Sequence, residues 1–356
     1  IMKKITSMIL ALVFAVSVIG SASAKTLKIQ LTFPKTSYDG QIVKMWTDRV
    51  TKLTRGELKF ELFSKGEVVG MKETLEAVDK GLVDGGAAWT HYWSNYHPAA
   101  MLFGSPVAGG GIGLSTKSWL AWYFDNGGKE LYDQLWSEMG MNVKGFVMAS
   151  SGPEALGWFK EPIKNMDDFR KYRFRTPPGI PGQTYKDIGI ASVSLSGGDI
   201  LPALEKGTID AAEWCCPKPD SVFGFQKVLK NYYLQGLHQN VVNGDIYING
   251  DVYNSLTDHQ KYAMEVASEA MITRNITNRA VENGKALIDL TENHGVKLWD
   301  TPADYFTEYM NAAQATLKKN AASNAFFKEV YEHMTAHAKI VVPFIAQMET
   351  SDASIG

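Results

Sequence analysis

Residues 203–210 read ALEKGTID, and residues 77–84 read AVDKGLVD. Each octet predicts the last turn of a helix, a glycine that ends the helix, and the start of a strand rich in aliphatic side chains. Gly207 and Gly81 stand at the same place in the two copies, and an aspartate closes each copy. A unit of helix, glycine stop and strand therefore occurs twice in the chain.

The residues up to the end of the first copy predict three strands joined by two helices. Apolar and polar residues alternate over 28–33 and over 58–62, which is the period of a strand. Apolar residues three or four positions apart predict a helix over 42–53, and a shorter helix is expected over 71–80. The third strand is predicted over 82–88.

The second copy lies within the same order of elements. Its expected elements are a strand over 172–176, a turn over 177–181, a helix over 182–188, a strand that begins at Val193, a helix over 199–206 and a closing segment over 209–214. Two matching orders of strands and helices predict an α/β protein with two lobes that face each other. Ligands of such folds lie at the carboxyl ends of the strands, which here means the crevice between the lobes.

The length of the chain agrees with two lobes, because about 330 residues after the N-terminal segment are too many for one simple core. We expect lobe I to comprise 25–149 and about 241–275. Lobe II is expected to comprise 150–240 and about 276–356, including the C-terminal helices.

The last hundred residues are predicted to be helical. Residues 257–260 fit a capping box, and apolar residues at helical spacing continue to Leu290. An unbroken helix of this length would measure roughly 50 Å, long enough to brace both lobes. Thr301 and Pro302 have the chemistry of an N-cap and a first helical residue. A closing amphipathic helix over 326–348 is expected to pack on the core or on a second subunit as a homodimer.

The N-terminus has the pattern of a signal peptide. Lys3 and Lys4 precede an apolar run over 8–19, and small residues over 21–24 fit a cleavage site. We therefore expect residues 1–24 to be a signal peptide and the protein to be exported to the periplasm. Loss of the two lysines takes the formal charge from −2 to −4, which is too weakly acidic to indicate any partnership with nucleic acid.

The two cysteines of the chain are neighbours, Cys215 and Cys216. A disulfide framework needs separated pairs and is excluded. Two alternatives stay open. The pair forms two small buried thiols, or it forms a vicinal disulfide, which an oxidising compartment permits but which is strained.

Three segments resemble the extracytoplasmic receptors of tripartite ATP-independent periplasmic (TRAP) transporters. They are residues 198–214, which end in Glu213-Trp214, residues 157–160, and residues 173–176 before a Pro/Gly turn. The Glu-Trp ending is similar to the branch that binds 2-oxo acids and related monocarboxylates. The resemblance implies a periplasmic binding protein-like fold and hinge closure over a small organic carboxylate. It also implies delivery of the ligand to a membrane permease.

The same resemblance implies that Arg175 grips the ligand carboxylate. A guanidinium presents two parallel donors to a carboxylate, and a desolvated cleft strengthens the pair. Arg173 shares a face of the strand with Arg175, so one of the two is expected at the surface. The alternative for Arg175 is an ordinary ion pair.

In the oxo-acid branch a cation bridges protein and ligand, and the resemblance implies its ligands here. Glu213 and the backbone of Trp214 carry over directly. Glu154 stands where the branch has a glutamine, and Gln239 stands where it has a glutamate. These four residues are expected to bind Na⁺ or Ca²⁺, since carboxylate and amide oxygens both serve as ligands of such ions. Alternatively, Glu154 and Glu213 receive the ammonium group of an amino acid.

Aromatic residues follow the third predicted strand and are expected to wall an apolar ligand tail. These residues are Trp89, Tyr92, Trp93 and Tyr96, with Trp158 and Trp214 facing them from the second lobe. Tyr92 is expected to donate a hydrogen bond to the ligand. For any one of these rings, packing in the core is the alternative.

The sequence offers little support for an enzyme. It contains no dinucleotide-binding glycine motif at the start of a helix, no phosphate-binding loop and no nucleophile elbow. His333 and His337 are four residues apart, but the glutamate precedes the pair, so the zinc-protease pattern fails. A receptor for a sugar or a peptide is the other rival, although neither ligand needs an arginine opposed by two carboxylates.

Overall fold

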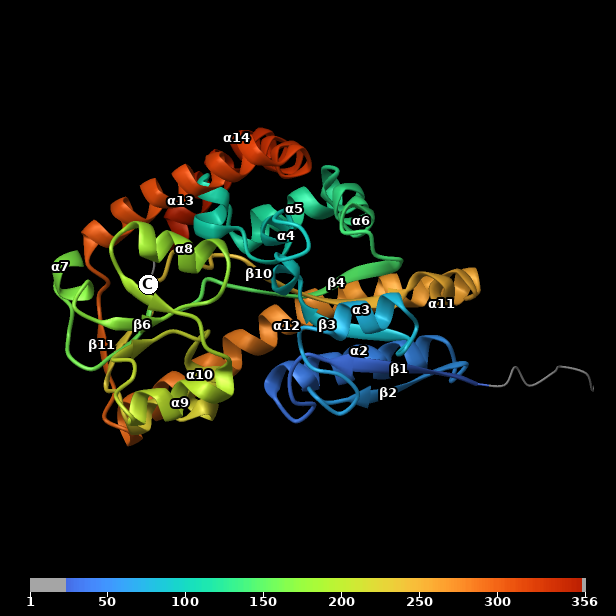
Figure 1. The fold of residues 1–356 in the computed structure, drawn as a ribbon, viewed down its shortest axis with the longest axis horizontal. Helices are drawn as coiled ribbons and strands as arrows, with labels where there is room; N and C mark the ends of the chain where they lie inside the picture. Colours follow the sequence, from blue (N-terminus) through green and yellow to red (C-terminus); the bar gives the residue numbers. More distant parts are fainter. Residues whose placement is uncertain (1–23, 354–356) are drawn as a thin grey trace, which may run out of the picture.

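The computed structural model describes residues 24–353. The predicted signal peptide therefore lies outside the described residues, apart from its last residue. Within the described part, no helix combines the length and the apolar character needed to span a membrane. Two β-sheets organise this part of the chain, and helices surround them (Figure 1).

The first sheet has the strand order β2-β1-β3-β10-β4. Strand β1 (Lys25–Leu31) pairs in parallel with β2 (Leu58–Phe63) and with β3 (Gly85–Trp89). Strands β10 (Val242–Asn249) and β4 (Val143–Ser151) complete the sheet in antiparallel pairing. The third strand begins three residues later than predicted, because 82–84 form the turn after the glycine stop.

The second sheet has the order β11-β9-β5-β8-β6-β7. Its strands are β5 (Gly157–Phe159), β6 (Arg173–Arg175), β7 (Ala191–Val193), β8 (Ala211–Ala212), β9 (Asn231–Tyr233) and β11 (Lys297–Trp299). Strand β6 pairs in parallel with β7 and β8, as β1 pairs with β2 and β3. The duplication predicted from the two octets is confirmed. However, Val193 ends a strand and does not begin one.

Helices connect the strands in the expected order. In the first half they are α2 (Tyr38–Leu53) and α3 (Thr74–Asp79), and in the second half α8 (Ile180–Asp187) and α9 (Gly197–Glu205). The remaining short helices are η1 (Thr90–Trp93), α4 (Ala100–Gly104), η2 (Val107–Gly111), α5 (Thr116–Asp125), α6 (Gly128–Glu138), α7 (Met166–Phe169), α10 (Pro217–Phe223), η3 (Phe225–Lys227) and α11 (Gly250–Asn254).

The long helix α12 (Asp258–Asn293) runs unbroken for 36 residues past both sheets (Figure 1). Thr257 and Gln260 form the predicted capping box. Met264 and Met271 are buried in the core of the first sheet, and Leu290 is buried in a core of the second. The helix therefore joins the two halves of the molecule, as its predicted length suggested.

The last two helices are α13 (Ala303–Ser323) and α14 (Ala325–Ala353). Helix α13 begins one residue later than predicted: Pro302 occupies the N-cap position, and no side chain caps the helix. Helix α14 packs on α13, α4, α5 and α6. Helix α14 therefore contacts elements that precede the second sheet in the chain.

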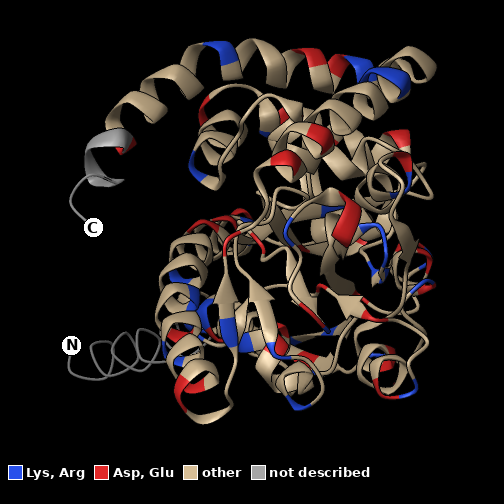
Figure 2. Cartoon of the chain, turned by 90° about the vertical axis from the view of Figure 1, so that its left-hand side faces the viewer, with Lys and Arg blue, Asp and Glu red and all other residues tan. Residues whose placement is uncertain are grey.

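Acidic and basic side chains are interspersed over the elements seen from the side (Figure 2). Inside the first sheet, however, one carboxyl group is fully buried. Asp245 on β10 accepts hydrogen bonds from the hydroxyls of Thr90 and Tyr132. Burial raises the pKa of Asp245 to about 7, although the two hydrogen bonds act in the opposite direction.

This raised pKa predicts a pH-dependent stability. Between about pH 4 and pH 7 the folded protein keeps the Asp245 proton and the unfolded chain loses it, so this group makes the free energy of unfolding fall as pH rises. Asp245→Asn should flatten this slope, as measured by urea unfolding at several pH values. An identical slope in the variant would contradict the assignment.

Candidate functional site

The centre of the site is Arg175, the last residue of β6, which is only 4% exposed. Its Nη1 donates to Glu213 Oε1 at 2.5 Å and to the Glu213 carbonyl at 2.9 Å. Its Nε and Nη2 donate to the carbonyl of Leu195 at 3.0 and 2.9 Å. By contrast, Arg173 is exposed and pairs with Asp210. The strand thus holds one surface arginine and one buried arginine.

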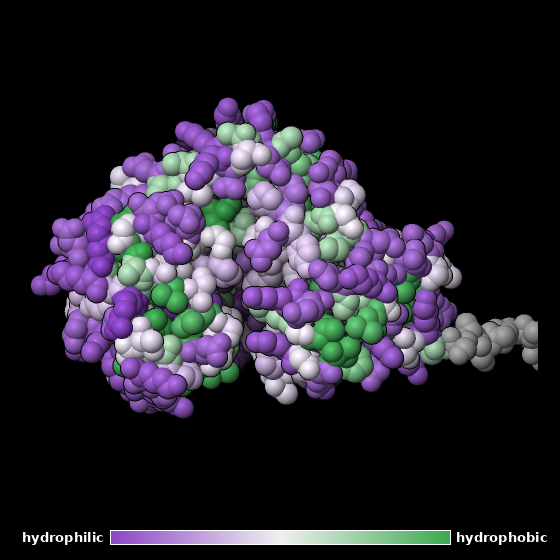
Figure 3. Space-filling model, viewed as in Figure 1, coloured by the Kyte–Doolittle hydropathy of each residue, from purple (hydrophilic) through white to green (hydrophobic). Residues whose placement is uncertain are grey.

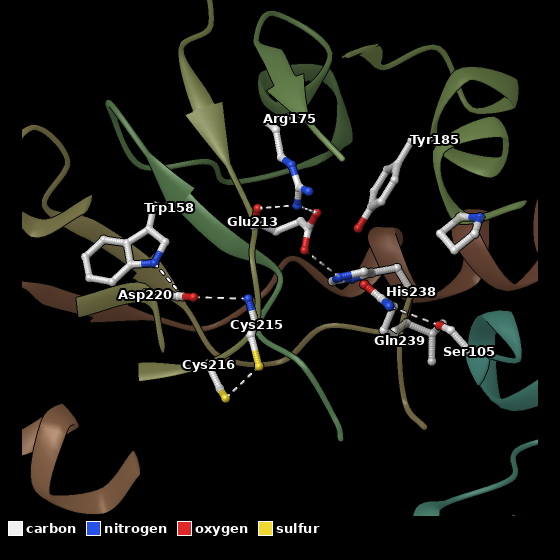
Figure 4. A network of polar contacts seen from close by, with 12 residues as sticks. Ser105, Trp158, Arg175, Tyr185, Glu213, Cys215, Cys216, Asp220, His238 and Gln239 are labelled. Carbon is white, nitrogen blue, oxygen red and sulfur yellow. Dashed lines mark hydrogen bonds and ion pairs between the residues drawn. The ribbon is translucent and has the colours of Figure 1, made fainter. Parts of the chain in front are cut away.

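Glu213 is fully buried and follows β8, which pairs with β6 in the second sheet. Two buried alanines form β8, and their small side chains let the neighbouring strands approach closely. Gly157 has a φ of +129°, and a Cβ at this position would meet the carbonyl oxygen of Ala212 at 2.5 Å. The backbone is therefore packed tightly at the point where Glu213 turns toward Arg175 (Figure 4).

A second buried carboxyl group, Glu154, lies beside Glu213. Ligand atoms of Glu154, Glu213 and His238 all lie within 4.8 Å of one another. Glu154 Oε2 and Glu213 Oε2 have no hydrogen-bond partner among the described residues, and neither do the two ring nitrogens of His238. Burial, and then the charge of Glu213, raise the pKa of Glu154 well above its usual range.

His238 was not predicted as a site residue. Within 237–239 only Gln239 was predicted, because the resemblance implies a cation-binding residue at that position. The His238 ring is fully buried and its Nε2 lies 3.5 Å from Glu213 Oε2. A lone histidine in a loop carries no periodic signal, so only the structure reveals its position.

Gln239 and Trp214 lie at the edges of the same cluster. The amide nitrogen of Gln239 donates to Ser105 Oγ at 3.1 Å, which fixes the orientation of the amide. The Arg175 guanidinium lies over the Trp214 ring at 4.9 Å. The predicted residues Arg175, Glu213 and Trp214 are therefore in direct contact. Glu154 and Gln239 are also neighbours, because the backbone N–H of Glu154 donates to the carbonyl of Gln239.

The aromatic residues divide between site and core. Tyr92 in η1 is partly buried, and burial raises the pKa of its hydroxyl. The charge of Arg175 lowers this pKa, and the charge of Glu154 raises it. Trp89 is partly buried at the end of β3. Trp158 is different. Its ring stacks on Tyr232, and its Nε1 donates a hydrogen bond to the buried Asp220. The expectation that Trp158 faces the site is therefore wrong.

Trp93 is also a core residue, since it is buried and packs edge-on against Tyr247. Tyr96 points to Glu76, to which its hydroxyl donates at 3.2 Å.

The side chains of the polar cluster are buried. Figure 3 shows a narrow furrow between two rounded masses. The cluster combines one guanidinium with two carboxyl groups, each with one oxygen that has no hydrogen-bond partner in the described part of the chain. Such a set of groups suits an organic anion together with a cation, because each would neutralise charge that the fold leaves buried.

A two-lobed α/β fold with a buried, oxygen-rich cluster suits a solute receptor. The chain belongs to the DctP family, described as bacterial extracellular solute-binding protein family 7, whose model matches residues 31–324.

Relatives of known function and structure support this assignment. The chain is 33% identical to a monocarboxylate 2-oxoacid-binding periplasmic protein of Nostoc sp., over 82% of this chain and 78% of that protein. It is 25% identical to a TRAP transporter solute binding protein of Bordetella bronchiseptica, solved with copurified calcium and picolinate. The TM-score is 0.85, covering 93% of this chain and 97% of that one.

A TRAP periplasmic solute binding protein of Colwellia psychrerythraea, solved with calcium and pyruvate, has the same fold. Its TM-score is 0.85 at 22% identity, over 94% of this chain and 99% of that chain.

Two adjacent buried carboxyl groups predict a measurable cost to stability. Glu154→Gln should raise the midpoint of thermal unfolding in metal-free buffer by about 2 °C or more, because it removes one buried acid. The same change should reduce the additional stabilisation that Ca²⁺ gives the wild type.

The matched control is Glu161→Gln, which changes an exposed glutamate at the surface. It should leave both quantities unchanged. A Glu154→Gln variant with the wild-type midpoint and the wild-type response to Ca²⁺ would place Glu154 outside the cation cluster.

Proposed function

We propose that this protein is the periplasmic receptor of a TRAP transporter and that it captures a small 2-oxo acid by closing its lobes. The observation that carries this proposal is the buried Arg175 opposite Glu213 and Glu154, each of which has an Oε2 atom without a hydrogen-bond partner among the described residues. The relative from Nostoc, named for binding 2-oxoacids, and the Bordetella structure with a bound carboxylate support it.

Arg175 has the free donor that this role needs. A guanidinium has five N–H groups, and four of those in Arg175 have partners within the described residues. The remaining N–H on Nη2 is available to a ligand carboxylate. The contacts from Leu195 and Glu213 hold the guanidinium in place before the ligand arrives, which reduces the entropy lost on binding.

The donor set also fits a hard cation. Glu154, Glu213 and Gln239 would hold Na⁺ or Ca²⁺ through side-chain oxygens, with the Trp214 backbone beside them. A bound cation would neutralise the two carboxylates. With Arg175, two ionised glutamates and a divalent ion, the cluster carries one net positive charge, which matches a monocarboxylate. His238 lies against Glu213 and restricts the approach of water.

A second candidate ligand is an amino acid. Glu154 is a carboxylate where the resembling branch has an amide, and two carboxylates can receive an ammonium group without a metal. Titration of pyruvate and alanine in the presence and absence of Ca²⁺ distinguishes the two ligands. The 2-oxo acid proposal expects tight, Ca²⁺-dependent binding of pyruvate only.

The mechanism we propose is hinge closure. Residues 25–149 with about 241–275 form one lobe, and residues 150–240 with about 276–356 form the other. The membership of the two sheets supports this division, because β11 joins the second sheet. Helix α12 and the strands β4 and β10 connect the lobes. The ligand enters the open furrow, Arg175 fixes its carboxylate, and the lobes close over it. The closed surface is what the permease recognises.

We also propose export by the signal peptide 1–24 and association through α14. The C-terminal part of α14 extends beyond the rest of the molecule (Figure 2). Ile340 and Phe344, one helical turn apart, are 73% and 65% exposed. An apolar stripe of this kind on an extended helix fits a self-complementary interface between two copies, and the related Bordetella protein was solved as a dimer.

The role of Arg175 predicts a large loss of affinity on its removal. Arg175→Ala should weaken pyruvate binding in the presence of Ca²⁺ by about 100-fold or more, because the ligand loses its charged partner and Glu213 becomes an unpaired buried charge. Titration calorimetry measures the effect. Arg173→Ala is the matched control, since it removes an arginine from the exposed end of the same strand, and it should bind as the wild type does.

The interface proposal predicts a change in oligomeric state. Ile340→Glu combined with Phe344→Glu should convert a dimer into a folded monomer, as measured by size-exclusion chromatography with light scattering. A wild-type protein that is monomeric at high concentration would contradict this part of the proposal.

A further inference from the structure

Two cysteine side chains lie beside the site without a role in the function proposed above. Cys215 and Cys216 follow Trp214, and both are free and buried. Their sulfur atoms are 2.9 Å apart (Figure 4). The Cys215 backbone is held firmly, since its N–H donates to Asp220 and its carbonyl accepts from the amide of Ala155.

Both sulfurs contact a second buried arginine. Arg279, near the middle of α12, directs Nη1 toward Cys215 Sγ at 3.3 Å and Cys216 Sγ at 3.7 Å. Its Nε donates to Asn275 on the same helix. Its Nη2 donates to Asp39 Oδ1 at 2.9 Å.

Arg279 therefore joins segments from both sheets. Asp39 is in the first turn of α2, which covers the first sheet, and the cysteines follow β8 of the second sheet. The guanidinium also lies over the rings of Tyr38 and Trp89, both from the first half of the chain. No expectation from the sequence included Arg279, because it lies in a mostly polar stretch of the helix.

We propose that Cys215 and Cys216 are a reversible oxidation site that controls the contact between Arg279 and the segment that follows β8. The oxidant is a small disulfide that reaches the open form of the protein. One cysteine sulfur attacks the small disulfide and releases one small thiol, and the second cysteine then displaces the other. The two cysteine thiols are oxidised to one disulfide, and the small disulfide is reduced to two thiols that carry the two protons.

The adjacency of the two residues makes this disulfide easy to reduce again. The Cα atoms of neighbouring residues are about 3.8 Å apart across a trans peptide, which is shorter than the range in which unstrained disulfides form. Strained disulfides are the labile and regulatory ones. The sulfurs nevertheless lie close together already, so the bond requires only a small local movement.

Oxidation changes what Arg279 contacts. To form a bond, the sulfurs must approach from 2.9 Å to about 2.05 Å, so at least one of them must leave the position in which Arg279 now contacts it. Arg279 keeps Asp39 and Asn275 as partners, but its link to the segment after Trp214 is weakened. We therefore expect the oxidised protein to close less readily over its ligand.

The test compares reduced protein with protein treated with oxidised glutathione. Intact mass spectrometry should show the loss of two hydrogen atoms with no added glutathione, and peptide mapping should locate the change to 215–216. Cys215→Ser and Cys216→Ser should each block this product. Two free thiols, or only glutathione adducts, in the treated wild type would overturn the proposal.

The coupling to Arg279 is tested on the same samples. Affinity for pyruvate with Ca²⁺ should fall about tenfold on oxidation, which corresponds to the loss of one hydrogen bond from a charged group. It should recover with dithiothreitol, and the double serine variant should not respond. An oxidised protein with unchanged affinity would overturn the coupling.

These outcomes are separate from those of the proposed function. If reduced wild type binds no pyruvate, the assignment of the ligand fails, while the mass measurement still decides the oxidation site. The coupling is then read from the midpoint of thermal unfolding without ligand. It should be lower after oxidation in the wild type only, and an unchanged midpoint would overturn the coupling.

Discussion

A guanidinium buried against a carboxylate constrains the whole centre of this molecule. Arg175 and Glu213 are both removed from water, and such a pair contributes little to stability unless further partners satisfy it. The backbone carbonyls of Leu195 and Glu213 supply part of what Arg175 requires. Glu154 then adds a second acid with an unpartnered oxygen. The described residues therefore leave this cluster electrostatically incomplete, which suits a site for a charged ligand.

The fold places these groups with few residues. Arg175 lies at the carboxyl end of β6, and the two alanines of the neighbouring strand β8 bring Glu213 beside it. Helix α12 runs past both sheets and carries Arg279 at the level where they meet. One guanidinium lies in the proposed ligand site, and the other connects the two halves through Asp39 and the cysteine pair. The proposed hinge closure would act on both contacts at once.

Much of this architecture is predictable from the sequence because it rests on local signals. The repeated octets indicate the duplicated sheets, and the capping box at Thr257 indicates the long helix. Arg175 and Glu213 are predictable only through the family resemblance, since no periodic pattern marks them. His238 and Arg279 were missed, because contacts across 25 and 64 residues set their positions. The same limitation explains why the expected position of Trp158 was wrong, because its burial depends on the ring of Tyr232 on β9.

The central claim is that Arg175 and the Glu154–Glu213 pair together trap an organic anion. The most direct measurement is a crystal structure of the protein grown with pyruvate and Ca²⁺. The account predicts carboxylate density within hydrogen-bond distance of Arg175 Nη2 and a metal peak between Glu154 and Glu213. Ligand density elsewhere, with Arg175 bonded only to Glu213 and Leu195, would contradict it.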